Sequence, residues 1–247
     1  PLLRRNIAFA LILTGWWIAS HTGLVNPFLL PSPERVVRAA AAMIADGSLW
    51  ANTIVSLGRV LAGFGLSVAA GIPLAILFAL QPMLRELAEP PLEFVRQTPP
   101  LALLPLLILW LGIGEMQKIG IIMLACFFPI FLGTLGGLAQ VDPKLIEVGR
   151  VCGLSRAALV RRIVLPSAAG AIVTGLRIAL GYSWRALVGA ELVAASSGLG
   201  YMIVDAQNLA RTDMVLVGVL VIGTLGLLAD MATRALIRRY LPWVPQT

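Results

Sequence analysis

The stretch that decides the fold is IGIIMLACFFPIFLGTLGGLAQV, residues 119–141, which holds no charged side chain. A helix needs about 20 mostly apolar residues to cross the hydrocarbon core of a bilayer, and this run is long enough. Over the whole chain 59% of residues are hydrophobic and only 13% are charged, whereas a soluble domain carries about 25% charged residues. With a mean hydropathy of +0.91, the composition excludes an ordinary soluble domain and a disordered one.

Five further runs share this apolar character. Together the runs predict an all-α polytopic membrane protein with one transmembrane domain over 1–247 and six spans, at about 7–25, 57–80, 97–114, 119–139, 167–190 and 214–237. Three prolines in the third span, Pro99, Pro100 and Pro105, predict a break or kink there. The first run is not read as a signal sequence, because Trp16 and Trp17 stand where a small-residue cleavage site would be needed.

Charge predicts the orientation of the spans. Most of the 19 Lys and Arg residues fall in segments that are cytoplasmic if both termini are cytoplasmic. We therefore read the net charge of +7 as basic loops that fix orientation in a membrane, and not as a sign of nucleic-acid binding. Two cysteines make no disulfide framework, and a single histidine excludes a His-rich metal site. Because the sequence begins with Pro1 and not Met, we expect the natural N-terminus to lie upstream.

A long polar interruption lies between the fourth and fifth spans: QVDPKLIEVGRVCGLSRAALVRRIVLP, residues 140–166. Asp142-Pro143 predicts the start of a helix that stops at Gly153, and Ser155 predicts the cap of a second short helix that Pro166 ends. The sequence leaves two interpretations open. The segment either fixes topology as an ordinary positive-inside loop or forms a folded helix–turn–helix that docks into a groove on a partner protein.

The same segment resembles the "EAA" loop of ABC importer permeases, the binding-protein-dependent transport family. That pattern is Glu-Ala-Ala, three residues, Gly, nine residues, then Ile-x-Leu-Pro. Here Glu147 is followed by Val148 and Gly149, then by Gly153 after three residues and by 163–166 (IVLP) after nine more. Every spacing matches, and the departures are Val148 and Gly149 in place of two alanines, which leaves open how the first helix packs.

Most of residues 28–242 is similar to the nitrate/sulfonate/taurine branch of that family. The stretches that carry this resemblance are LPSPERVV (30–37), PPLALLPLLILWLGIGE (99–115), LRIALGYSW (176–184), AELVAASSGLGYMI (190–203) and TDMVLVG (212–218). The resemblance implies a type I ABC importer permease fold with a cytoplasmic coupling helix. It also implies transport of a small anionic solute, taurine-, alkanesulfonate- or nitrate-like, by alternating access.

The resemblance further implies the partners. These are ABC ATPase subunits, a second copy of this chain in a homodimer, and a periplasmic solute-binding protein that docks on 26–52 and 191–213. The residues expected to couple to the ATPase are Glu147, Gly153, Leu154, Ser155 and Arg156.

The chain itself offers no site for ATP. A P-loop needs Gly-Lys-Ser/Thr to cradle phosphates, and the only two lysines, Lys118 and Lys144, follow Gln117 and Pro143. We therefore expect no cofactor and no catalysis in this chain, with ATP and Mg²⁺ bound by the partner ATPase.

Two arginines in the otherwise apolar fifth span, Arg177 and Arg185, are candidates for an anion path, because charge in a span is costly and suggests function. The alternative is that Arg185 snorkels outward and Arg177 pairs with an acid on another helix. Weaker candidates are Tyr182 and Trp184, which could gate the path or pack between helices, and Glu191, which is more easily read as an interfacial carboxylate.

Three other classes of protein remain alternatives. The first is a channel or secondary transporter that no ATPase drives, although we find no repeated halves with broken helices. An intramembrane enzyme would need a catalytic set, and the sequence holds no HExxH motif. A purely structural subunit would have no use for a folded loop at 140–166. Co-purification of an ATPase would separate the importer permease from a channel.

Overall fold

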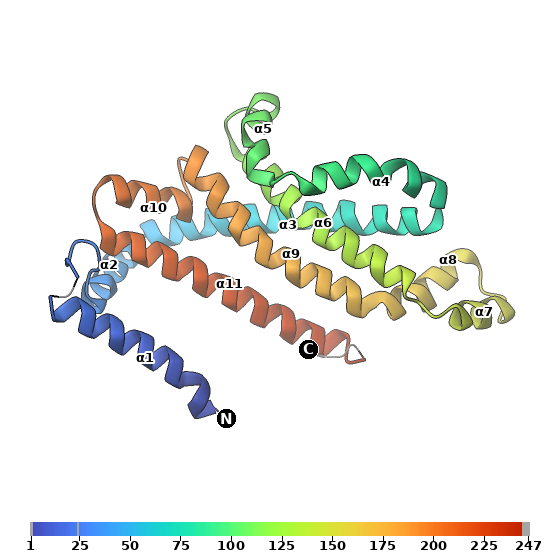
Figure 1. Ribbon diagram of the computed structural model, residues 1–247, viewed down its shortest axis with the longest axis horizontal. Coiled ribbons are helices and arrows are strands. Elements are labelled where there is room, and N and C mark those ends of the chain that lie inside the picture. The colour runs from blue at the N-terminus through green and yellow to red at the C-terminus, as the bar shows by residue number, and fades with distance from the viewer. Residues whose placement is uncertain (1, 24, 244–247) are drawn as a thin grey trace. The chain divides into compact units, whose positions relative to one another are not determined.

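The computed structural model describes residues 2–23 and 25–243, and all regular elements in that part are helices (Figure 1). In chain order the helices are α1 (Leu2–His21), α2 (Pro33–Ala45), α3 (Ser48–Leu80), α4 (Pro82–Gln97), η1 (Pro100–Leu103), α5 (Leu104–Leu111), α6 (Glu115–Ala139), α7 (Pro143–Val151), α8 (Arg156–Leu159), η2 (Val160–Val164), α9 (Leu165–Ala194), α10 (Leu199–Asn208) and α11 (Thr212–Tyr240). Two compact units are formed, one by Pro1–Ser56 with Ala195–Thr224 and the other by Leu57–Ala194 with Leu225–Thr247. The boundaries between the units fall within α3 and α11 and after α9.

The first unit is held together by side chains that cap helix ends. Ser32 caps α2 by accepting a hydrogen bond from the Arg35 amide, Pro33 occupies the first turn, and α2 ends at Asp46. Within the same unit, α3 caps the start of α10, because the Asn52 side chain accepts from the Gly198 amide at 2.7 Å. These contacts satisfy amides that a helix start leaves without an intrahelical partner.

The second unit is organised around α6 and α9, which cross at very close range. A Cβ added at Gly133 would lie 2.8 Å from Gly175 Cα, and one added at Gly137 would lie 2.7 Å from Ala171 Cβ. The spacing Gly133–Gly137 therefore lets the two backbones approach as small-xxx-small pairs do in membrane helices. Phe78 of α3 and Phe131 of α6 extend this packing with rings 5.5 Å apart, edge to face.

Four helices are long and apolar enough to cross a membrane: Ser48–Leu80, Glu115–Ala139, Arg156–Val193 and Thr212–Tyr240. Within the described residues, the pair Pro82–Gln97 and Pro100–Leu111, which is bent by 92°, is a fifth candidate. These helices contain the predicted spans 57–80, 119–139, 167–190 and 214–237. The predicted span 97–114 is not one straight helix, because α4, η1 and α5 meet at its prolines, and the predicted span 7–25 lies in α1 as far as His21. The count of six remains a prediction.

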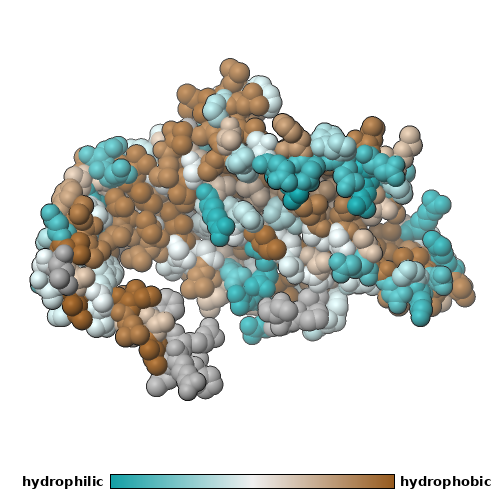
Figure 2. Space-filling model, in the orientation of Figure 1, coloured by the Kyte–Doolittle hydropathy of each residue, from teal (hydrophilic) through white to brown (hydrophobic). Residues whose placement is uncertain are grey.

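The surface of the second unit separates apolar from hydrophilic side chains by element. In Figure 2 hydrophilic side chains gather over α4 and over the end of the molecule formed by α7 and α8. Apolar side chains are exposed over much of the rest of the visible face, between smaller hydrophilic patches, as expected for helices whose solvent is lipid.

One prediction about helix ends is wrong. Pro166 does not end the second short helix of the 140–166 segment, since α9 starts at Leu165 and continues through Pro166 to Ala194. The reason is η2, a π-helical turn over Val160–Val164 that directly precedes the proline. Such a turn widens the helix locally and accommodates a ring that carries no N–H, so the helix continues through the proline.

Candidate functional site

The segment 140–166 is folded by local capping, as its sequence predicts. The Asp142 side chain accepts a hydrogen bond from the Lys144 amide at 2.9 Å and starts α7. Gly153 has φ +73°, and two hydrogen bonds, Leu154 N to Gly149 O and Gly153 N to Arg150 O, close the end of α7. This pair of bonds is the Schellman pattern, which requires a left-handed residue and hence favours glycine.

The second half of the segment packs back on the first. Ser155 caps α8 by accepting from the Ala158 amide. Gly149, the second residue that departs from the family pattern, is buried, and a Cβ there would lie 2.6 Å from Ile163 Cδ1 and 3.3 Å from Leu159 Cδ1. Gly149 therefore faces the second half of the segment, and its missing methyl group lets the two halves lie close.

An apolar face of α7 is left uncovered in the chain. Leu145, Val148 and Val151 repeat every three residues and are 46%, 60% and 89% exposed. Glu147 is exposed beside them, and Arg156 is exposed at the start of α8. Large aliphatic side chains at such exposure on a short, rigidly capped helix form a surface that a partner protein can cover.

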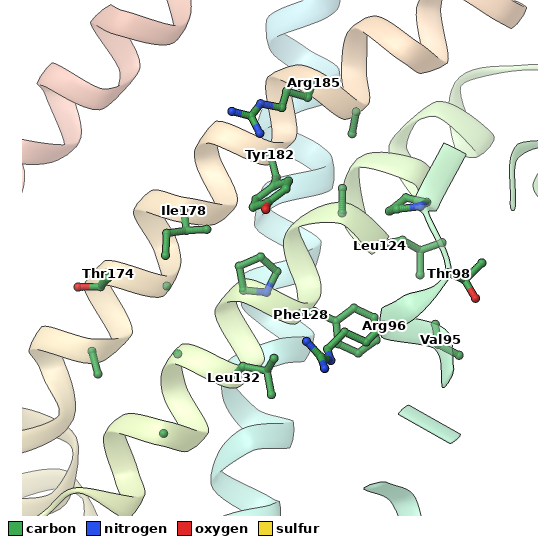
Figure 3. A pocket seen from close by; sticks show the side chains of 18 of the residues that line it. Val95, Arg96, Thr98, Leu124, Phe128, Leu132, Thr174, Ile178, Tyr182 and Arg185 are labelled. Carbon is green, nitrogen blue, oxygen red and sulfur yellow. The ribbon is translucent and has the colours of Figure 1, made fainter. Parts of the chain in front are cut away.

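Two of the substrate-path candidates line a cavity of about 980 Å³ in the second unit (Figure 3). Tyr182 and Arg185 project from α9, and the Arg185 Cζ lies 5.5 Å from the centre of the Tyr182 ring. The opposing walls come from α6 and from the α4–η1 bend, with Arg96 at the end of α4. Arg96 is not among the candidates that the sequence suggested.

The other arginine of the pair, Arg177, is engaged elsewhere. Its guanidinium lies 3.3 Å from Asp230 of α11, and Asp230 also pairs with Arg234 at 2.6 Å, one helical turn further on. Of the two possibilities that the sequence left open for Arg177, the structure shows pairing with an acid on another helix.

Trp184 and Glu191 do not line the cavity. Trp184 is buried, and its indole packs near Gly226 of α11. The position of Glu191 near the end of a span suggests an interfacial carboxylate, and this interpretation is wrong. Glu191 is buried, and it accepts a hydrogen bond from Arg59 Nη1 at 2.6 Å, because α3 and α9 bring residues 132 positions apart together.

Comparison with known proteins identifies the family. Residues 71–242 match the family of binding-protein-dependent transport system inner membrane components. The chain belongs to this family. The permease is 40% identical to the taurine transport system permease protein TauC of Escherichia coli over 95% of this chain and 87% of that protein. It is 36% identical to a putative aliphatic sulfonates transport permease protein, SsuC of Bacillus subtilis, over 95% and 85% of the two chains.

Two further comparisons agree with this assignment. The nitrate import permease protein NrtB of Synechocystis is 32% identical over 93% of the permease and 86% of that protein. A chain of the inward-facing MetNI methionine ABC transporter shares the fold, with a TM-score of 0.58 and 18% identity, over 73% of the permease and 92% of that chain. The resemblance read from the sequence is confirmed for both the family and the taurine, sulfonate and nitrate branch.

The permease also contains an ionic cluster that sequence reasoning missed, formed by the buried side chains of Arg59, Lys118 and Glu191 together with Glu115, which is 56% exposed. Arg59 is 2% exposed and donates two hydrogen bonds of 2.6 Å to the Glu115 carboxylate as well as the one to Glu191. Lys118 Nζ lies 3.1 Å from Glu115. The available signal was Arg59 itself, a charge next to a long apolar run, where an ionic partner is needed.

Proposed function

We propose that the chain is the transmembrane permease subunit of an ATP-driven importer. It would move a small anionic solute, of the taurine, alkanesulfonate or nitrate type, from a periplasmic binding protein into the cytoplasm by alternating access. The named relatives support this substrate class, since they are permeases for taurine, aliphatic sulfonates and nitrate.

The observation that carries the proposal is the exposed apolar face of α7 in a chain that has no P-loop. Transport against a gradient needs an energy source, and this sequence offers no Gly-Lys-Ser/Thr to bind phosphates. A capped helix with exposed Leu145, Val148 and Val151 offers a docking surface through which a separate ATPase could move the spans. In this proposal Glu147, Gly153, Leu154, Ser155 and Arg156 form the coupling contact, and the partner ATPase binds ATP and Mg²⁺.

The assembly that this function requires has two copies of the permease, two ATPases and one external binding protein. Both termini and the 140–166 segment would be cytoplasmic in the inner membrane, and 26–52 with 191–213 would receive the binding protein. Closure of the ATPases would move the two coupling segments together and switch the spans between inward-open and outward-open arrangements. Arg185 and Tyr182 would line the route of the anion.

Two coupling variants test this function in proteoliposomes with the ATPase and binding protein present. Gly153→Val forces a β-branched residue to φ +73° and costs about 1–3 kcal/mol of strain, so ATP-driven uptake should fall about tenfold or more. Glu147→Lys changes an exposed residue, and it should abolish stimulation of the ATPase by loaded binding protein without lowering the melting temperature.

Lys144→Ala is the matched control, because Lys144 is exposed on α7 but lies outside the matching motif positions. It should transport at the normal rate. Normal uptake together with normal ATPase stimulation in both coupling variants would show that the 140–166 segment does not couple the ATPase to transport. A chain that purifies from its native membrane with no ATPase would favour the alternative, a channel or secondary transporter.

The two cysteines allow a separate test of orientation. Cys152 is exposed next to Gly153, whereas Cys126 is buried and its thiol donates to Ala179 O at 3.3 Å. A membrane-impermeant maleimide should label Cys152 from the cytoplasmic side only, and bound ATPase should slow the labelling. The Cys152→Ser variant should take up no label. Labelling from the periplasmic side would place the segment on the wrong face and contradict the proposed function.

A further inference from the structure

The 980 Å³ cavity of the second unit has an unusual charge balance. Both charged side chains among its lining residues, Arg96 and Arg185, are cationic, and the rest of the wall is apolar or neutral. Cations against low-dielectric walls attract a small anion more strongly than the same charges do in water. Arginine is also suited to oxyanions, because its planar fork matches two oxygen atoms.

The two arginines differ in their present partners. Arg185 lies against the Tyr182 ring, and within the described part of the chain no carboxylate lies within ion-pair distance of it. Arg96 is held through Nε and Nη2 by the Glu93 carboxylate, one turn earlier on α4, with an Nε–Oε2 distance of 2.7 Å. Glu93 also accepts a hydrogen bond from Gln97 at 2.8 Å.

Glu93 is not among the residues that line the large cavity. It lines a smaller neighbouring cavity of about 90 Å³, and Arg96, Phe128 and Leu132 line both cavities. In Figure 3 Arg96 lies beside Phe128 on the wall facing the α9 residues Tyr182 and Arg185. Because Glu93 contacts Nε and Nη2 of Arg96, the Nη1 group can donate to another acceptor.

We propose that the large cavity is an anion site with two cationic walls, in which Glu93 is the counter-ion that the entering anion displaces from Arg96. This inference rests on the proposed function and adds the residues that set affinity for the anion. The site would take a small oxyanion such as an alkanesulfonate, with Arg185 and Tyr182 on one wall and Arg96 on the other. When the cavity is empty, Glu93 neutralises Arg96 at the end of α4.

The proposal predicts opposite effects for two neighbouring substitutions. Arg96→Gln removes a cationic ligand and should weaken binding of the anion by a factor of about ten to a hundred. Glu93→Gln removes the competing carboxylate and should tighten binding about three- to tenfold. Arg185→Gln should weaken binding as Arg96→Gln does. A residue that only stabilised α4 through its ion pair would change the melting temperature without changing affinity.

The experiment uses the permease–ATPase complex in nanodiscs of phosphatidylcholine, titrated calorimetrically with ethanesulfonate in gluconate buffer. Arg238→Gln is the control, because Arg238 is exposed on α11 outside both cavities and should bind as the wild type does. Unchanged affinity in Arg96→Gln and Glu93→Gln would overturn the proposal. So would the absence of ethanesulfonate binding in the wild type, because phosphatidylcholine supplies no anionic headgroup that could compete for the cavity.

A parallel measurement of ATPase stimulation by loaded binding protein separates the two proposals. If stimulation is normal and the affinities do not change, the importer function stands and the anion site is wrong. If the wild-type complex shows no stimulation at all, the importer function itself fails.

Discussion

Replacing Arg59 with methionine should lower the free energy of unfolding of the permease by about 3–5 kcal/mol, the usual cost of breaking a buried ion pair from one side. Arg59 is 2% exposed and contacts both Glu115 and Glu191, so the variant keeps two carboxylates in place and removes the cation they share. Methionine has a similar length, and the loss therefore reflects charge and hydrogen bonds more than lost volume. Thermal unfolding of the purified protein in detergent measures the effect.

Two companion variants make the result specific. Arg59→Lys keeps the charge but cannot supply the planar fork that serves two carboxylates, and its stability should be intermediate. Arg238→Met changes an exposed arginine and should alter the free energy of unfolding by no more than about 0.5 kcal/mol. Equal melting temperatures for Arg59→Met and Arg238→Met would show that the cluster does not hold α3, α6 and α9 together.

Gly175→Ala should destabilise the permease although it adds a single methyl group. A Cβ at Gly175 would lie 2.6 Å from Pro129 O and 3.2 Å from Gly133 Cα, so the backbones of α6 and α9 must move apart. Overpacking of this kind costs about 1–3 kcal/mol. Because Gly133 and Gly175 also line the large cavity, the shift should alter anion binding as well. Unfolding in detergent and the ethanesulfonate titration measure the two effects.

The same helix provides the control. Gly181 is exposed, and a Cβ there meets nothing within 4 Å. Gly181→Ala should therefore be neutral or stabilise by up to about 1 kcal/mol through helix propensity. Of the two glycine-to-alanine changes on α9, only Gly175→Ala should therefore lower the free energy of unfolding. A stabilising Gly175→Ala would mean that α6 and α9 do not cross at the distance described.

The 140–166 segment shows how much of a candidate site local sequence can predict. The sequence predicts a helix start at Asp142, a helix stop at Gly153 and a second cap at Ser155, and each residue takes that role. Capping works within four residues of the chain, so the sequence contains all the partners that it needs. The wrong prediction at Pro166 also concerns local structure. It fails because the position of a proline in the sequence does not reveal a π-helical turn.

The candidate substrate path shows the opposite case. The sequence placed Arg177 and Arg185 eight residues apart on one helix, and only the fold separates their roles. Asp230, from a helix 53 residues further on, engages Arg177, while the α4–η1 bend brings Arg96 to the cavity that Arg185 lines. Pairings between distant helices depend on which faces meet, and hydropathy along one helix does not encode that.

The sequence by itself determined that the chain is a helical membrane protein of the importer permease family, because a bilayer demands long apolar runs and the motif at 140–166 is defined by local spacing. Tertiary structure alone decided which charges are neutralised and which face a cavity. Glu191 and Arg59 are 132 residues apart, and they meet because three helices converge where an isolated charge would be too costly. The cavity likewise depends on tertiary structure, because its walls come from α6, α9 and the α4–η1 bend, which are distant in the sequence.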